Sequence, residues 1–580
     1  MILQALFEYY QRKAADPESS IAPEGFEWKE LPFLIVIDDD GNFVRLEDTR
    51  EGEGKKKRGK KYLVPQGEKR TVGIAANLLW DNPEYVLGAN YRGRSDVALR
   101  HEAFIERYKM AFSSSFLNPG VVTAMKFLES NAEKKKAIDA LSDEAWKEFL
   151  ESNANTSIRI EGRSHQTIAD EIASLAVEES CDEKGVCLVS GKDDLIPALN
   201  PAIKGVRDAQ SSGAALVSFN LPAFRSYGKE QNENAPIGKN AVFAYTTALN
   251  GLLGDDPNHI QIGDATTIFW AQKKDSVFEK NLKPFFFAAG KKKDDPDRDA
   301  ADTKANLESA LSGIPPAEMA TRFYILGLSP NAARISVRFW HQGTVGEFCM
   351  TMKRHFADLE IIAPAYDPCR MSLQYLLGAT VRDWKSEDIP PNLAGNVMRA
   401  VLNDTLYPET FSNQCIRRIR AEREVSRARA SILKACLNRK TRSSCSGKEK
   451  EMTVALDSSN TNVGYRLGRL FAVLEKIQED ASPGLNATIR DRYYGAASSS
   501  PSTVFPRLLS LTNHHLAKLE NRGQKINHEK RLAVIIDGLT PSMPAHLVMD
   551  DQARFAIGYY HQRQALFTST KDNTQGARNE

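Results

Sequence analysis

The order of hydrophobic and polar positions divides the chain into a strand-containing part and a helix-rich part. Apolar runs at 33–37 and 43–46 flank the turn sequence 39–42 (DDGN), a pattern typical of a β-hairpin. Apolar residues at helical spacing predict a helix near 97–112, and more helices are expected between 121 and 177. Further strands are predicted at 214–219, 242–245, 266–270, 321–328 and 334–340.

The last of these predicted strands has a regular alternation. Ile335, Val337 and Phe339 alternate with Arg334, Ser336 and Arg338. Because successive side chains of a strand point to opposite faces, this pattern predicts one buried face and one cationic face.

From about residue 371 the pattern becomes helical. One apolar stripe comprises Leu467, Leu470, Phe471, Leu474 and Ile477, and a second comprises Leu508, Thr512, His515, Leu516 and Leu519. A strand is predicted only at 532–536. The fold class is therefore predicted as α+β, with a mixed N-terminal α/β region containing antiparallel strands (1–370) and a C-terminal helical bundle (371–580). The charged stretch 290–302 is predicted to be a linker or insertion loop.

The bulk composition indicates a globular protein. The 580 residues are 42% hydrophobic and 26% charged, with a net charge of +2, which excludes a wholly basic, histone-like binder. Seven cysteines, an odd and low number, favour a reducing compartment over a disulfide framework. Apolar runs are too short for a membrane span and the N-terminus does not have the pattern of a signal peptide, so we expect a cytoplasmic protein without a membrane partner.

The sequence offers no convincing catalytic motif. Residues 185–192 (GVCLVSGK) resemble a phosphate-binding loop, but the glycine spacing is one residue too long and Asp193 replaces the hydroxyl residue that binds magnesium. Cys181 and Cys187 lack the second pair that a zinc knuckle needs. We therefore predict no catalytic residue, no metal ligand and no cofactor.

Three segments have the composition of a nucleic-acid contact. Six cations occupy seven positions in 55–61, which suits phosphate binding or a solvated loop. Residues 417–442 hold ten Lys or Arg and two Glu, and predict a long helix with one cationic edge unless these cations pair with acidic neighbours. Residues 225–240 are rich in Gly, Asn, Gln and Lys, whose amides can pair with base edges, although the same composition suits an ordinary surface loop.

Several long blocks carry a resemblance to a known family. They include 79–88 (LWDNPEYVLG), 216–253 (LVSFNLPAFRSYGKEQNENAPIGKNAVFAYTTALNGLL), 323–340 (FYILGLSPNAARISVRFW), 465–478 (YRLGRLFAVLEKIQ), 486–498 (NATIRDRYYGAAS) and 558–565 (GYYHQRQA). Through these blocks the chain resembles the large subunit of the type I-C (Dvulg subtype) CRISPR Cascade complex, the Cas-eight family. The segments 55–61 and 291–302 look variable by comparison.

The resemblance implies a non-catalytic subunit. Such a protein would recognise the PAM in foreign double-stranded DNA, help to open the duplex and hold the displaced strand, while CRISPR RNA reads the target by base pairing. Its implied partners are the CRISPR RNA, the target DNA, the backbone, 5′-handle and small subunits, and a helicase-nuclease that cleaves. A small subunit can arise in this family from an internal start, for which Met452 is the candidate.

Chemistry within that framework assigns roles to individual residues. The predicted PAM-reading residues are Lys229, Gln231, Asn232 and Asn234, with Asn77 as a weaker candidate. The predicted phosphate clamp comprises Lys55, Lys56, Lys57, Arg58, Lys60 and Lys61, and the predicted path of the displaced strand comprises Arg420, Arg423, Arg427 and Lys434. The alternatives are a stand-alone nuclease acting on CRISPR RNA or DNA, and a purely architectural subunit.

Overall fold

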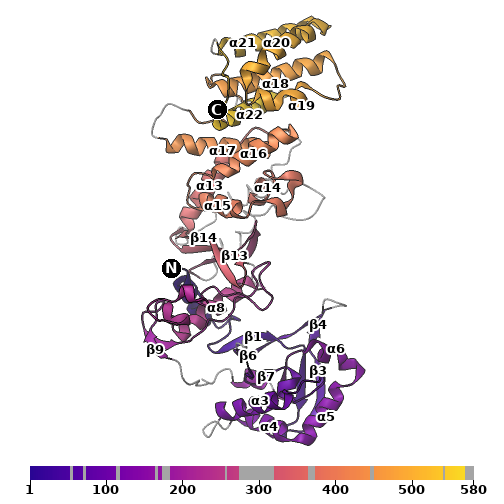
Figure 1. Cartoon of the computed structure of the whole chain (residues 1–580), viewed down its shortest axis with the longest axis vertical. Helices are drawn as coiled ribbons and strands as arrows, with labels where there is room; N and C mark the ends of the chain where they lie inside the picture. The colour runs from indigo at the N-terminus through magenta and orange to yellow at the C-terminus, as the bar shows by residue number, and fades with distance from the viewer. Residues whose placement is uncertain are drawn as a thin grey trace. The chain divides into compact units, whose positions relative to one another are not determined.

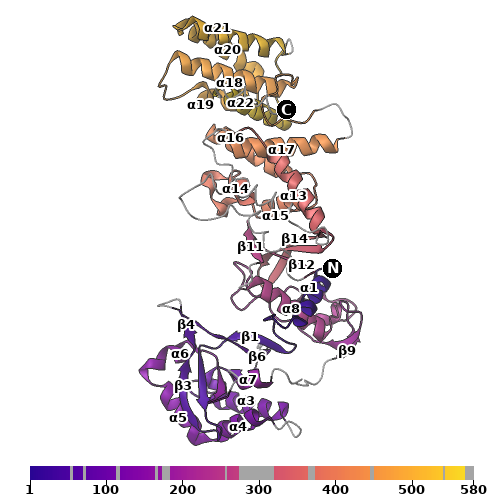
Figure 2. The same ribbon diagram turned by 180° about the vertical axis from the view of Figure 1, so that it is seen from behind.

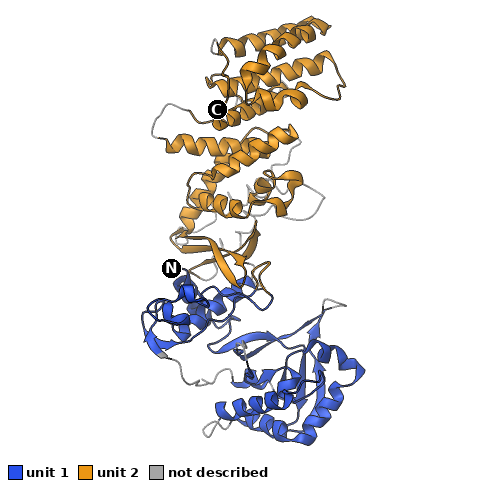
Figure 3. Cartoon of the chain, in the orientation of Figure 1, with its two compact units in different colours: residues 1–204, 211–254 blue, residues 205–210, 255–580 orange. Residues whose placement is uncertain are grey.

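The computed structural model divides the chain into two compact units. The first comprises residues 1–204 and 211–254, and the second 205–210 and 255–580 (Figure 3). The described residues are all except 53–56, 69–72, 113–117, 164–166, 173–182, 255–257, 274–318, 364–371, 445–449, 540–541 and 568–580. The predicted linker at 290–302 lies outside the described residues.

A four-stranded mixed sheet lies in the first unit (Figure 1). In the order β3-β2-β8-β7, strand β2 (Phe33–Ile37) is antiparallel to β3 (Phe43–Asp48) and parallel to β8 (Thr156–Ile160), and β7 (Trp80–Asp81) completes the sheet. All five residues of β2 are buried, which explains its uninterrupted apolar run. The predicted hairpin is confirmed: the Asp38 N–H donates to the Asn42 carbonyl at 3.0 Å across the turn.

The remaining elements before residue 173 are short strands and helices. Strand β1 (Phe26–Glu30) pairs with β6 (Lys61–Pro65), and β4 (Arg50–Glu51) pairs with β5 (Arg58–Gly59). The helices are α1 (Ile2–Ala14), α2 (Pro83–Val86), α3 (Val97–Ala111), α4 (Pro119–Glu129), α5 (Asn131–Leu141), η2 (Glu144–Trp146), α6 (Lys147–Ser152) and α7 (Ile168–Ile172). Helix α3 confirms the helix predicted near 97–112.

A buried helix replaces one of the predicted strands. The apolar run at 242–245 lies within α8 (Lys239–Leu253), which has buried residues on several sides and whose Phe243 ring meets Tyr10 of α1 edge-on, 5.5 Å between centroids. A short, continuous apolar run shows no periodicity, so in the sequence a helix that is buried on several sides cannot be distinguished from a buried strand. The strand predicted at 532–536 is also wrong, because these residues lie within α21 (Arg522–Asp537), where Ile535 is buried but Val534 and Ile536 are exposed. The strand predicted at 214–219 is reduced to an isolated bridge between Ala214 and Ile203.

The second unit begins with an antiparallel meander. Its four strands are β11 (His259–Ile262), β12 (Ala265–Ala271), β13 (Arg322–Asn331) and β14 (Arg334–Thr344), paired in chain order. The last three confirm the strands predicted at 266–270, 321–328 and 334–340.

A bulge in β14 overturns the predicted alternation. Val337 pairs with Leu328 but Phe339 pairs with Gly327, so Arg338 is an extra residue between them. Phe339 joins the main core of the unit, whereas Val337 is 43% exposed. Arg338 itself is bound within the protein, with its Nη2 2.6 Å from a carboxylate oxygen of Asp264. The strand therefore lacks the predicted division into a buried face and a cationic face.

The elements described after β14 are all helices (Figure 2). They are α13 (Val345–Leu359), α14 (Leu373–Gly378), η5 (Arg382–Trp384), η6 (Ser386–Asp388), α15 (Pro391–Leu402), α16 (Glu409–Glu422), α17 (Arg427–Ser443), α18 (Val463–Ala481), α19 (Ile489–Ala497), α20 (Pro501–Lys518), α21 and α22 (Met549–Phe567). Together with the sheets, they confirm the α+β class. The stripe that runs from Leu467 to Ile477 is buried in α18, as predicted.

One hydrophobic core joins the meander to these helices. It extends from Ile260 in β11 to Tyr559 in α22 and includes residues of α13, α15, α16 and α17. The boundary predicted at 370/371 falls inside this core, and the division between compact units lies at 254/255 instead. The strands of the meander cannot be separated from the helices without exposing buried apolar surface.

Candidate nucleic-acid interface

One of the predicted contact segments contains a loop of residues 225–234, which we call the amide loop. It connects η3 (Pro222–Phe224) to α8 and contains η4 (Gln231–Asn234). Earlier in the same unit, β9 (Glu183–Val186) and β10 (Asp193–Ile196) form a hairpin, and the chain that follows β10 supplies the anchor of the loop. Residues 185–192 thus connect two strands, whereas a phosphate-binding loop leads from a strand into a helix.

Asn232 anchors the amide loop. Its side chain is 2% exposed, donates to the Pro197 carbonyl at 2.8 Å and accepts from the Asn200 amide at 2.8 Å. Its backbone N–H donates to the Ala198 carbonyl at 3.3 Å. A side chain whose donor and acceptor are used inside the protein is not available to a base edge, so the role predicted for Asn232 becomes a positioning role.

Asn234 closes the loop on itself. Its carbonyl oxygen accepts the Ser226 N–H at 2.9 Å, and its amide nitrogen donates to the carbonyls of Lys229 and Gln231 at 3.2 and 3.0 Å. An ion pair between Arg225 and Glu230, 2.7 Å apart, adds a second link across the loop. Asn234 is therefore also a positioning residue, contrary to its predicted part in base reading.

Solvent reaches the tip of the loop. Lys229 is exposed and Gln231 is partly exposed, and the internal hydrogen bonds of the loop use the side chains of Asn232 and Asn234 rather than those of these two residues. Tyr227 lies between Arg225 and Lys229 in the sequence and is fully exposed. It was not among the predicted site residues, because the prediction considered only amide and cationic side chains. The signal was available in the sequence as an aromatic residue beside a Gly-Lys pair.

Asn77, the weaker PAM candidate, has a structural role in a different segment. It is 6% exposed, its side-chain oxygen accepts the Glu68 N–H at 2.8 Å, and its own N–H donates to Asp81 at 3.0 Å. These bonds hold the chain that enters β7. We therefore withdraw Asn77 from the residues that would read bases.

The predicted phosphate clamp is partly described. Lys55 and Lys56 lie outside the described residues, whereas Lys57, Arg58, Lys60 and Lys61 are exposed on or beside β5 and β6. Acidic residues lie opposite two of them, because Arg58 pairs in register with Glu51 and Lys61 with Glu30. The described part of this segment is cationic and accessible, and acidic residues on the paired strands partly balance its charge.

The predicted cationic helix of 417–442 is interrupted. Helix α16 ends at Arg423, whose φ of 57° is left-handed, and α17 begins anew after Ser426, whose hydroxyl accepts the Arg429 N–H at 3.4 Å. Ser426 is a helix-start signal that the sequence contained and the prediction missed. The cations before and after this turn consequently have different surroundings.

The cations of α16 and of the turn face solvent. Arg417, Arg420 and Arg423 are exposed. The structure describes no ion pair for these three among the residues it covers, whereas the neighbouring Arg418 pairs with Glu422 at 3.0 Å. Arg420 and Arg423, which were predicted to contact the displaced strand, are accessible to solvent, and Arg417, which was not predicted, is accessible too.

Along α17 the cations turn inward. Lys434 is 3% exposed and donates to the Asp358 carbonyl at 3.1 Å, and its burial lowers its pKa. Arg439 is equally buried and binds the Asp358 carboxylate at 2.8 Å. Arg427 is half-buried, with a guanidinium nitrogen 3.5 Å from the Ile361 carbonyl. Lys434 is thus not available to a displaced strand, because α13 supplies its partner and buries it.

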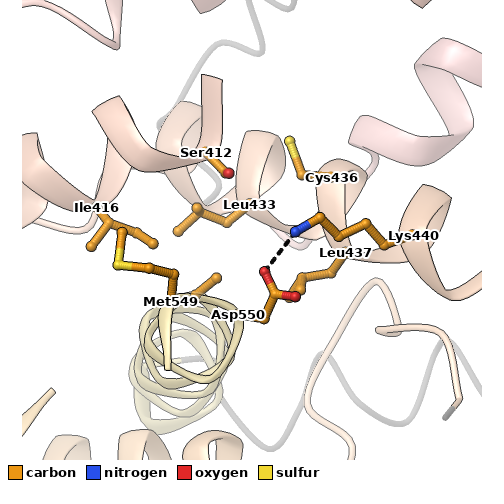
Figure 4. A pocket seen from close by; sticks show the side chains of 9 residues that line it. Ser412, Ile416, Leu433, Cys436, Leu437, Lys440, Met549 and Asp550 are labelled. Atoms are coloured by element: carbon orange, nitrogen blue, oxygen red, sulfur yellow. Dashed lines mark hydrogen bonds and ion pairs between the residues drawn. The ribbon is translucent and has the colours of Figure 1, made fainter. Parts of the chain in front are cut away.

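The second unit contains a small cavity. It lies among α16, α17 and α22, and its wall includes Cys436 and an ion pair between Lys440 and Asp550, 2.9 Å apart (Figure 4). Its volume of about 10 Å³ accommodates about one water molecule. A small-molecule site normally needs several hundred Å³, so this cavity is a packing defect.

In the described part of the chain, no group of three or more His, Cys, Asp or Glu side chains is arranged to hold a metal ion. No helix within the same residues combines the length and the apolar character that crossing a bilayer requires.

Comparison with known proteins gives one clear result. Residues 6–567 match the sequence model of a protein family described as CRISPR-associated protein (Cas_Csd1). The match spans both compact units and all of the segments discussed above. No curated protein matches the chain.

Proposed function

The chain belongs to the Csd1 family of CRISPR-associated proteins, and from that premise we propose that it is the non-catalytic large subunit of a type I-C Cascade complex. In this role it recognises the PAM in foreign double-stranded DNA, helps to open the duplex and holds part of the displaced strand. CRISPR RNA pairs with the target, and a separate helicase-nuclease cleaves it. The match over residues 6–567 is the observation that carries the proposal.

The amide loop supports a role in PAM recognition. It is a short segment held rigid by internal hydrogen bonds, with Lys229 and Gln231 at its accessible side. Lysine can donate to guanine O6 and N7, and glutamine can bond adenine N6 and N7, in the major groove. We assign base reading to these two residues, with Asn232 and Asn234 holding the loop in shape.

Exposed cations support contacts to the DNA backbone. Lys57, Arg58, Lys60 and Lys61 are accessible on the first unit, and Arg417, Arg420 and Arg423 are accessible on the second. Phosphate contacts position a protein on DNA without reading its sequence. We propose that the first group binds the duplex and the second group binds the displaced strand.

We also propose that Met452 is an internal translation start that yields a small subunit of residues 452–580. Met452 lies just before the complete set of helices α18 to α22, and the preceding Lys-Glu codons (448–451) can form a purine-rich ribosome-binding site. Mass spectrometry of the purified complex should find this fragment. A Met452→Leu variant should lack the fragment and keep the full chain, and an unchanged fragment would exclude this start.

Competition between PAM-containing and PAM-free duplexes tests the main proposal. Complexes that carry Lys229→Ala or Gln231→Ala should lose discrimination by roughly 5- to 100-fold per lost base contact. Lys192→Ala, which removes an exposed lysine from the turn between β9 and β10, is the matched control and should discriminate normally.

Three results would contradict the proposal in different ways. Normal discrimination by both loop variants would remove the amide loop from PAM reading. Cleavage of nucleic acid by the purified chain with magnesium or manganese would replace the proposal with a nuclease. If complexes that lack this chain still selected the correct targets, the chain would be a purely architectural subunit.

A further inference from the structure

Tyr227 is the most exposed large side chain of the amide loop. Its relative exposure is 100%, so no part of the phenol ring is covered by the protein. Removing an aromatic ring from water is favourable, and a ring left wholly in water therefore gains nothing from the fold that presents it.

The backbone beneath Tyr227 is nevertheless held in an unfavourable conformation. Tyr227 has a φ of 53° and is followed by Gly228 with a φ of 74°. Left-handed backbone is costly for a residue with a Cβ, and it persists only where surrounding bonds impose it. Here those bonds come from Asn234, which links Ser226 on one side of the tip to Lys229 on the other. The ring is therefore projected from a rigid turn.

A second exposed aromatic residue, Trp384, has a strained backbone that a contact within the protein explains. Trp384 also has a positive φ, 58°, and is 41% exposed. Its indole stacks on Tyr375 with 4.6 Å between centroids and lies so close to Gly378 that a Cβ there would be 2.9 Å away. The strained backbone at Trp384 places the ring against the protein, whereas the strain at Tyr227 places the ring away from it.

The surroundings of Tyr227 indicate what its partner is. The other exposed charged residues of the amide loop are Arg225, Lys229, Glu230 and Glu233, whereas the core of a protein–protein interface is depleted in charged residues. Full exposure leaves both sides of the ring unobstructed, and Lys229 can meet a phosphate, whereas Arg225 is already paired with Glu230 at 2.7 Å. An aromatic ring between small residues and flanking cations is the combination used to stack on a nucleobase.

We propose that Tyr227 stacks on an unpaired nucleobase of the target DNA where the duplex opens. This inference rests on the proposed function and adds to it a residue whose aromatic ring, rather than a hydrogen-bonding group, contacts the DNA. Because every base has an aromatic face, the contact is tolerant of sequence and is distinct from PAM reading by Lys229 and Gln231.

Fluorescence of 2-aminopurine in the target duplex tests the contact in the assembled complex. With 2-aminopurine at successive positions beside the PAM, stacking on Tyr227 should quench the signal of an opened base at one position. Tyr227→Ala should abolish that quenching and weaken target binding about tenfold, the typical effect of losing one stacked base. Tyr227→Phe should behave like the wild type, because the ring and not the hydroxyl makes the contact. Trp384→Ala is the matched control and should change neither signal.

The alternatives give different results. If Tyr227→Ala leaves quenching and affinity unchanged, the stacking role is wrong. If Tyr227→Ala prevents assembly with the other subunits while the full chain alone binds DNA as before, Tyr227 contacts a protein and the proposal is overturned. Failure of the proposed function itself would be seen in wild-type complexes, as equal binding to PAM-containing and PAM-free duplexes. Equal thermal melting of the variants and the wild type shows that folding is intact.

Discussion

At the scale of single residues, burial separates side chains that bind the protein from those that can bind a partner. Asn232 and Lys434 are polar residues in segments rich in amides or cations, and both are at most 3% exposed. Each is held by carbonyl oxygens from another part of the chain, Pro197 for Asn232 and Asp358 for Lys434. A buried polar side chain with bonded partners stabilises the fold, and its loss leaves those partners unpaired.

Two buried histidines predict that the stability of the second unit depends on pH. His355 is fully buried beside the Tyr407 hydroxyl, 2.5 Å from its Nδ1, and burial lowers its pKa to about 3. Burial also lowers the pKa of His561 to about 4. Both histidines are therefore protonated near pH 6.5 in the unfolded chain, whereas in the folded chain they stay neutral until the pH is much lower.

This difference predicts the direction of the pH effect. The stabilisation from a neutral buried histidine is complete above pH 6.5 and is lost as the pH falls from 6.5 toward the folded pKa. Unfolding by urea should show a loss of roughly 2 kcal/mol per histidine between pH 7 and pH 5. His355→Gln should reduce the pH dependence of the free energy of unfolding, and curves parallel to the wild type would contradict the prediction.

At the scale of elements, α18 and α22 approach each other through glycines. The two helices lie side by side in both views (Figures 1 and 2). A Cβ added at Gly468 would lie 2.0 Å from the Phe555 carbonyl oxygen, and one added at Gly558 would lie 2.2 Å from the Tyr465 carbonyl oxygen. The neighbouring atoms belong to backbone, so the helices would have to separate to make room.

Gly468→Ala should therefore be strongly destabilising. We expect a loss of about 2–3 kcal/mol or more in the free energy of unfolding, because overpacking a rigid helix contact costs this much. Gly495→Ala in α19 is the matched control, since nothing lies within 4 Å of its added Cβ. That variant should be neutral or up to about 1 kcal/mol more stable, because alanine favours a helix. Similar effects of the two variants on urea unfolding would contradict this account of the contact.

The turn between α16 and α17 presents the accessible cations of its segment. Removing two of them, in Arg420→Ala with Arg423→Ala, should weaken binding of all DNA sequences equally. The slope of log affinity against log salt should fall by about 1.4, since each phosphate contact on single-stranded DNA contributes about 0.7. Titration of DNA into the complex at several salt concentrations measures both effects.

A control variant that loses the same number of positive charges distinguishes the loss of a specific phosphate contact from the loss of net charge. Arg382→Ala with Lys385→Ala removes two exposed cations elsewhere in the second unit. We expect this variant to keep the wild-type salt slope. If both pairs lower the slope equally, the turn has no special part in strand binding.

At the scale of the whole molecule, the boundary between the two compact units does not coincide with the point where strands give way to helices. The units divide at 254/255, within the strand-containing part of the chain. The meander and the helices of the second unit share one core, while α18 to α22 also pack closely among themselves. Phe471 is central to the C-terminal helices, with ring contacts to Tyr494, Phe505, Phe555 and Tyr559. Residues 452–580 therefore contain a core of their own.

A fragment of residues 452–580 should fold when expressed alone. Circular dichroism should show a helical protein with a cooperative thermal transition. The transition should be less stable than that of the full chain, because α17 no longer covers α22 and Met452 loses the bonds that its backbone makes with Asn438. Phe471→Ala should destabilise both the fragment and the full chain by about 3–5 kcal/mol. A fragment that shows no cooperative transition would contradict the prediction.

The sequence by itself determined the α+β class, the first hairpin, the stripes of α18 and α20, and the family. These depend on local periodicity or on long blocks of residues, both of which are complete in the sequence. Tertiary structure alone decided which amides and cations face solvent. The partners of Asn232, Asn77 and Lys434 come from other segments, and the bulge at Arg338 and the turn at Arg423 redirect side chains that a regular period would place elsewhere. Burial depends on which distant segments meet, and it decides whether a polar side chain serves the fold or a partner.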